Sequence, residues 1–151
     1  MNGSRIESLL RRDSKCSSMF AGVFAIDRLP KTFQTPTLFV CNTDPHYEKG
    51  QHWIVLYVEN SSYGEYFDSF GRPPLDIFRE FLNRHCKYWI FNENHLQSSV
   101  SHFCGHYCIF YCLHRCRDKN ITSITNLLTS DTGLNDYLIH SFVCKTLNNK
   151  I

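Results

Sequence analysis

Four residues of this 151-residue chain have the side chains, and follow in the order, that hydrolysis by a thiol requires. Cys104 could serve as the nucleophile, and Gln97, seven residues earlier, as a side-chain amide for the developing oxyanion. His52 could act as the general base and Asp68, sixteen residues later, as the group that orients it. No single residue is informative alone, but together they predict peptide hydrolysis through a covalent thiol intermediate.

Cys104 is predicted to begin a helix that spans residues 104–117. Unpaired N–H groups and the helix dipole at such a position favour the thiolate and lower the pKa of a cysteine. Gly105, which has no Cβ, would let a substrate carbonyl approach the backbone. The alternative is that Cys104 is one more buried thiol of a helix that carries three others at four-residue intervals, namely Cys108, Cys112 and Cys116. That stripe is expected to be core packing.

The partners of Cys104 are expected at the ends of two strands. His52 begins a strand that is apolar on both alternations, and Asp68 ends the next strand, so a hairpin could bring them together. Each has a simpler interpretation: an idle histidine at a strand edge, a turn-forming aspartate, and, for Gln97, a solvated loop residue. Trp53 is expected either to shield the His52–Asp68 pair from water or to pack in the core.

Composition and charge exclude several classes of protein. The hydrophobic content of 42%, with 20% charged residues, fits one globular domain over residues 1–151. A net charge of +2 is too small to indicate a nucleic-acid partner by itself. The sequence has no apolar run long enough for a membrane span and none at its N-terminus that resembles a signal peptide.

The eight cysteines predict reduced thiols in an intracellular protein rather than a disulfide framework. Cysteines four residues apart on one helix are poorly placed to pair with each other. A zinc site is not expected, because the spacing of His102, Cys104, His106 and Cys108 does not resemble a four-ligand site.

The sequence predicts an α+β fold with a central mixed or antiparallel sheet packed with helices. A capping box at Ser4–Glu7 indicates a first helix to Arg12, and residues 19–26 form an apolar segment. Strands are predicted over residues 37–41, 52–58, 63–68 and 87–91. Further helices are predicted over residues 75–83, 122–128 and 135–147, the first with Leu75, Phe78, Phe81 and Leu82 buried.

These motifs resemble those of the adenovirus protease (adenain) family, including related proteases of Maverick/Polinton elements and similar DNA viruses. The resemblance rests on Asn42-Thr43 ten residues before His52-Trp53, on Phe67-Asp68-Ser69-Phe70-Gly71, and on Gln97 before Cys104-Gly105. It covers roughly residues 5–116. Adenovirus enzymes commonly carry glutamate where this chain has Asp68, although SUMO-protease relatives use aspartate, and this chain is shorter than those enzymes.

The resemblance implies a monomeric viral cysteine endopeptidase that cleaves capsid and core precursors during particle maturation, in the virion and the host nucleus. It implies a preference for small residues, especially glycine, near the scissile bond. It also implies activation by a viral peptide and by DNA. The peptide would be tethered by a disulfide to Cys86, which stands eighteen residues before Cys104; the alternative is that Cys86 is an ordinary buried thiol.

Two other functions remain open on the sequence. A protease of the same clan that removes ubiquitin-like modifiers would use the same four residues. A binding protein could keep the fold without catalysis, although the intact set of four residues disfavours this.

Overall fold

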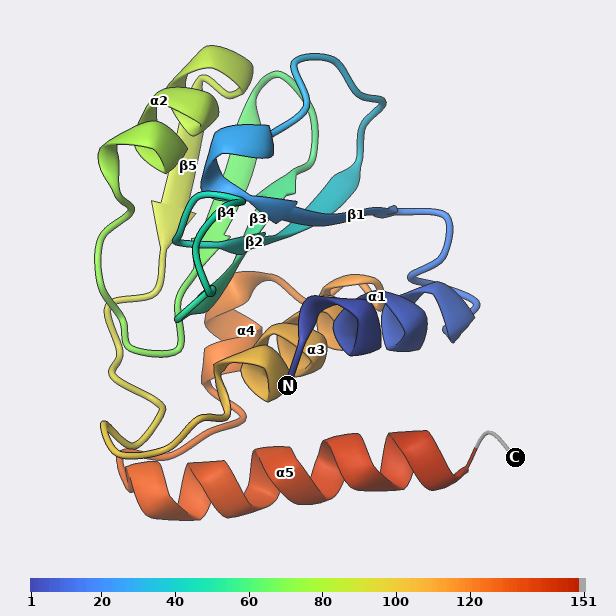
Figure 1. The fold of residues 1–151 in the computed structure, drawn as a ribbon, viewed down its shortest axis with the longest axis vertical. Coiled ribbons are helices and arrows are strands. Elements are labelled where there is room, and N and C mark those ends of the chain that lie inside the picture. Colours follow the sequence, from blue (N-terminus) through green and yellow to red (C-terminus); the bar gives the residue numbers. More distant parts are fainter. Residues whose placement is uncertain (150–151) are drawn as a thin grey trace.

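A five-stranded mixed sheet organises the fold in the computed structural model, which describes residues 1–149 (Figure 1). Its strands follow one another in chain order across the sheet: β1 (Phe20–Ala25), β2 (Thr37–Asn42), β3 (Trp53–Val58), β4 (Tyr63–Phe67) and β5 (Tyr88–Phe91). The pairs β2–β3 and β3–β4 are antiparallel, whereas β1 joins β2 and β5 joins β4 in parallel. The predicted α+β class is confirmed, and the sheet is of the mixed type.

Helices cover both faces of this sheet (Figure 1). On one face lies α2 (Asp76–His85), which packs Phe78, Phe81 and Leu82 against alternate residues of β2 and β3. On the other face lie α1 (Gly3–Arg12), α3 (Cys104–Arg115) and α4 (Ile121–Thr125), with α5 (Thr132–Asn148) outermost. Because β3 is covered on both faces, its apolar residues do not alternate with polar ones, as the sequence predicts.

The helix α3 forms the centre of the larger core. Nearly all of its side chains are buried, because it contacts β3, α1, α4 and α5 on different sides. A helix that is apolar all round needs such an enclosure. Its first residue, Cys104, is therefore carried by one of the most firmly supported elements of the fold.

Three details differ from the sequence-based expectations. Helix α1 begins at Gly3, and Asn2 caps it by accepting a hydrogen bond at 3.0 Å from the Arg5 N–H; the capping box at Ser4 is wrong, since Ser4 lies inside the first turn. The segment 19–26, expected only to be apolar, contains the strand β1, which pairs in parallel with β2. Leu75 precedes α2 and is half exposed, so it is not part of the buried face.

The C-terminal helices are also shifted. The segment predicted over 122–128 is the short helix α4, which Asn120 caps through the Ser123 N–H. The segment predicted over 135–147 begins earlier, because Asp131 caps α5 by accepting from the Leu134 N–H at 3.0 Å. Within residues 1–149, no helix combines the length and the apolar character that crossing a bilayer would need.

Candidate active site

His52 and Asp68 lie at the same end of the β3–β4 hairpin. The register pairs Val55 with Phe67, so the residue just before β3 and the residue just after β4 reach the same edge of the sheet. There His52 Nε2 lies 2.7 Å from Asp68 Oδ1, and both side chains are largely withdrawn from solvent. The predicted contact between the two is present in the structure.

Hydrogen bonds hold both the backbone and the carboxylate of Asp68 in place. Asn92, just after β5, accepts from the Asp68 N–H at 3.1 Å and donates to the Asp68 carbonyl at 2.6 Å. Asp68 Oδ1 also accepts from the Phe70 N–H at 2.8 Å. These bonds fix the orientation of the carboxylate, and hence of the imidazole that it binds. Nothing in the local sequence around Asn92 indicates this role.

Cys104 reaches the same edge from the opposite layer, as the first residue of α3. Its thiol lies close enough to the His52 ring to interact with it, and Nδ1 is the ring nitrogen that Asp68 does not engage. The backbone N–H groups of Trp53 and Gly105 also lie near the Cys104 sulfur and favour its thiolate form. Asp68, His52 and Cys104 are therefore brought together, with His52 between the carboxylate and the thiol.

This environment shifts the pKa values of Cys104 and His52 in opposite directions. Burial raises the pKa of Cys104, but the hydrogen bond to His52 and the N–H groups of Trp53 and Gly105 outweigh it, so the pKa lies below its ordinary value. Burial lowers the pKa of His52, but the bonds to Asp68 and Cys104 outweigh it and raise the pKa to about 9. Both shifts act in the direction of a thiolate beside an imidazolium.

Phe70 is a member of the site that sequence reasoning missed. Its ring stacks on the His52 imidazole with centroids 4.9 Å apart and an interplanar angle of 28°. The guanidinium carbon of Arg72 lies 4.9 Å from the centroid of the Phe70 ring, and His95 meets that ring edge-on. The Phe70 side chain thus covers one face of the His52 imidazole. The sequence places Phe70 two residues after Asp68, which was the available signal.

Trp53 and Gly105 have structural roles that the sequence left open. Trp53 donates from Nε1 to the Met1 carbonyl at 3.2 Å and packs beside α1 and α3. Its indole is therefore a partly buried part of the core. The side chain that stacks on the His52 ring is Phe70. A Cβ on Gly105 would lie 3.1 Å from Ile6 Cδ1, so the Ile6 side chain would have to shift by a few tenths of an ångström to make room for it. Glycine therefore suits the close approach of α1 to α3 at this position, independently of any substrate.

Gln97 is buried between the loops that carry the other site residues. Its Oε1 accepts from Ser69 Oγ at 2.6 Å, next to Asp68, and its Nε2 donates to the carbonyl and hydroxyl of Ser101 at 3.1 Å each. The solvated-loop interpretation is thus incompatible with its burial. To bind an oxyanion, one amide hydrogen must turn from Ser101 towards the substrate.

Cys86 lies away from this constellation. It caps the C-terminus of α2 just before β5 and is 5% exposed, with its sulfur facing Gly64 of β4. Burial raises the pKa of its thiol, which opposes thiolate formation. Attachment of a peptide to Cys86 would therefore require the α2–β5 junction to open.

The described residues contain no arrangement of three or more His, Cys, Asp or Glu side chains suited to a metal ion.

Comparison with known proteins identifies the fold. No protein-family model and no curated protein matches the sequence. Two crystal structures of the ASFV pS273R protease do match, one with a TM-score of 0.66 and the selenomethionine form with 0.61, each at 19% identity. They cover 92% and 93% of this chain, which spans 66% of the length of that protease. The chain has the SUMO-protease-like fold of the ASFV enzyme; the narrower resemblance to adenain has no support from a family model.

Proposed function

We propose that this protein is a cysteine endopeptidase with Cys104 as nucleophile. The observation that carries the proposal is the position of His52 between Asp68, to which it is hydrogen-bonded, and Cys104, with the thiol and imidazole pKa values moved towards an ion pair. The shared fold with a viral protease supports it. Cleavage of quenched fluorescent peptides by the purified chain, and its loss on alkylation of Cys104, tests it.

The proposed reaction follows from the protonation states. The Cys104 thiolate attacks the scissile carbonyl, and the Cys104 N–H and Gln97 stabilise the resulting oxyanion. The His52 imidazolium then gives its proton to the leaving amine, which leaves an acyl-enzyme. Neutral His52 removes a proton from water, the hydroxide displaces the thiolate, and the imidazolium is restored. Asp68 keeps the imidazole oriented and stabilises its charge throughout.

The substrates we propose are viral precursor polypeptides cut during particle maturation, in the virion and the host nucleus. The fold of the ASFV protease supports a viral setting. A protease acting on ubiquitin-like modifiers would use the same constellation, so a direct comparison is needed. Gly-Gly-containing precursor peptides should be cleaved in preference to modifier–fluorophore conjugates; the opposite preference would reassign the substrate class while keeping the chemistry.

The pH dependence of kcat/KM should be bell-shaped, with its acidic limb below the titration range of an ordinary cysteine. Activity rises as Cys104 loses its proton, and the lowered pKa places this limb below that of an ordinary cysteine. Activity falls when the His52 imidazolium is lost, near its pKa of about 9. Peptide hydrolysis from pH 5 to 10 at constant ionic strength measures both limbs. A rate that only climbs through the titration range of a free thiol would contradict the ion pair.

Gln97→Ala should lower kcat by about 10²–10³-fold, the scale of losing one oxyanion donor in a water-excluded site. Ser69→Ala is the matched control, because it removes the bond to Gln97 Oε1 while keeping the amide donor. Its effect should be smaller. If Gln97→Ala changes only KM, Gln97 is a substrate contact, whereas no change in either kcat or KM would remove it from the mechanism.

Activation by a tethered peptide stays a proposal, with Cys86 as the attachment point. Within residues 1–149, β5 has no strand on its outer side, so an activating peptide could add there as a strand. A disulfide would keep the peptide bound at low concentration. DNA as a second activator rests on the family resemblance alone.

Cys86→Ser should therefore reduce the activity of enzyme matured with its own precursors under non-reducing conditions, where mass spectrometry should show a peptide adduct on Cys86. Cys41→Ser, at another buried thiol, serves as the control. Full activity of the isolated chain, unaffected by Cys86→Ser, would contradict this proposal.

A further inference from the structure

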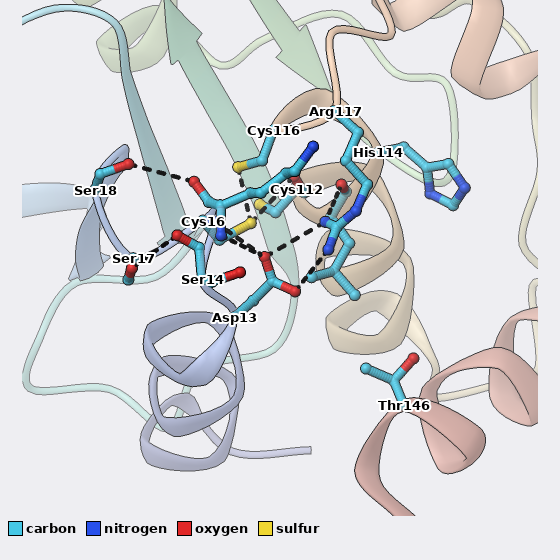
Figure 2. Close-up of polar contacts among 12 residues, drawn as sticks. Asp13, Ser14, Cys16, Ser17, Ser18, Cys112, His114, Cys116, Arg117 and Thr146 are labelled. Carbon is cyan, nitrogen blue, oxygen red and sulfur yellow. Dashed lines mark hydrogen bonds and ion pairs between the residues drawn. The ribbon is translucent and has the colours of Figure 1, made fainter. Parts of the chain in front are cut away.

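Two cysteines that are 100 residues apart in the sequence meet behind the active-site helix. The sulfur of Cys16, in the turn between α1 and β1, lies 2.8 Å from the sulfur of Cys116, which caps the C-terminus of α3 (Figure 2). Both thiols are free and buried, Cys16 completely and Cys116 with 8% exposure. No other two cysteine thiols within residues 1–149 share a hydrogen bond.

The backbone on both sides of this pair is already held together. Asp13, just before the turn, accepts from the Cys16 N–H at 3.0 Å and forms an ion pair at 2.8 Å with Arg117, the neighbour of Cys116 (Figure 2). The Cys16 thiol also donates to the Cys112 carbonyl at 3.4 Å. The hydrogen bonds of Cys16 and the ion pair between Asp13 and Arg117 thus hold the two sulfurs close together without a covalent bond between them.

We propose that Cys16 and Cys116 form an oxidisable dithiol, which closes to a disulfide on reaction with a two-electron oxidant of the peroxide class. A disulfide bond is about 2.05 Å long, so the sulfurs must approach by less than about 1 Å. This inference does not depend on the proposed protease activity.

The reaction balances as two thiols and one hydrogen peroxide giving one disulfide and two waters. The Cys116 sulfur, the more exposed of the two, attacks the peroxide O–O bond and becomes a sulfenic acid with release of water. The Cys16 sulfur then displaces the hydroxyl from the Cys116 sulfur, and the second water leaves with the Cys16 proton. The bond to Cys116 and burial raise the pKa of Cys16, which disfavours its thiolate and leaves it to the second, resolving step.

The disulfide would act on stability rather than on the chemistry at Cys104. It would join the α1–β1 turn to one end of α3, whereas Cys104 lies at the other end, twelve residues and about 18 Å away along the helix. A cross-link that closes so long a loop restricts the unfolded chain strongly. Oxidation should therefore raise Tm, and reduction should reverse the change.

The test uses the full chain with Cys104→Ala and Cys144→Ser, so that neither the nucleophile nor the partly exposed thiol reacts. After hydrogen peroxide treatment and alkylation of the remaining thiols, non-reducing peptide mapping should show a Cys16–Cys116 linked pair. Tm should rise by at least about 5 °C and return with dithiothreitol. Adding Cys16→Ser should abolish both effects, whereas adding Cys41→Ser should preserve them.

Absence of the linked pair, or linkage of Cys16 or Cys116 to a different cysteine, would overturn the proposal. So would an equal rise of Tm in the Cys16→Ser variant. The peptide map is made on a chain that keeps both Cys16 and Cys116, so it gives a decisive answer even where Cys16→Ser folds poorly.

Discussion

Replacing Cys104 with alanine should abolish peptide cleavage and leave the fold intact. In the proposed mechanism the Cys104 thiolate beside His52 is the nucleophile, and without it only binding and oxyanion contacts remain. The loss of kcat should therefore reach the detection limit. Continuous peptide hydrolysis measures it, and thermal unfolding checks that Tm is within a few degrees of the parent.

Cys108→Ala is the matched control, one turn further along the same helix. Cys108 is fully buried, and burial raises its pKa well above the ordinary value, so its thiol is inert. This variant should lose some stability but keep its turnover. Near-normal turnover in Cys104→Ala together with a dead Cys108→Ala would show that the site has been assigned to the wrong residue.

Asp68→Asn should lower kcat by orders of magnitude, towards the roughly 10⁴-fold loss that the same exchange causes in a serine-protease triad. The amide keeps an oxygen for the Phe70 N–H but loses the charge that stabilises the His52 imidazolium. The alkaline limb of the pH profile should therefore move to lower pH. Asp68→Glu should be milder, because it retains the charge.

Asp76→Asn controls for the general effect of removing an acidic residue, since Asp76 pairs with Arg79 on the exposed surface of α2. It should leave kcat and the alkaline limb unchanged. If Asp68→Asn and Asp68→Glu both behave like Asp76→Asn, Asp68 has no part in the mechanism.

The elements that carry the site could be predicted because each has a local signal. The unbroken apolar run of β3 predicts a strand covered on both faces, and the position of Cys104 after a polar loop predicts the start of α3. His52 and Asp68 could be predicted as neighbours because a short hairpin joins their strands. The pattern of Gln97 and Cys104 in the sequence indicates the chemistry, but not that the amide of Gln97 is engaged by Ser69 and Ser101.

The remaining features depend on contacts between distant parts of the chain. The parallel pairing of β1 with β2 has no turn signal, because parallel strands need a longer connection. Asn2 and Ser4 are both good capping residues, so the sequence could not decide between them. The stacking of Phe70 on His52 and the meeting of Cys16 with Cys116 arise only when the sheet and α3 are assembled.

Labelling with a peptidyl vinyl sulfone at pH 7, followed by mass spectrometric mapping, tests most directly whether Cys104 is an activated nucleophile. Cys144 is the internal reference, because it is the most exposed of the eight cysteines, whereas Cys104 is 9% exposed. If Cys104 is the activated nucleophile, one adduct should form on Cys104, faster than any on Cys144. This adduct should be lost in His52→Ala. Labelling of Cys144 first, or labelling of Cys104 at the same rate in His52→Ala, would contradict it.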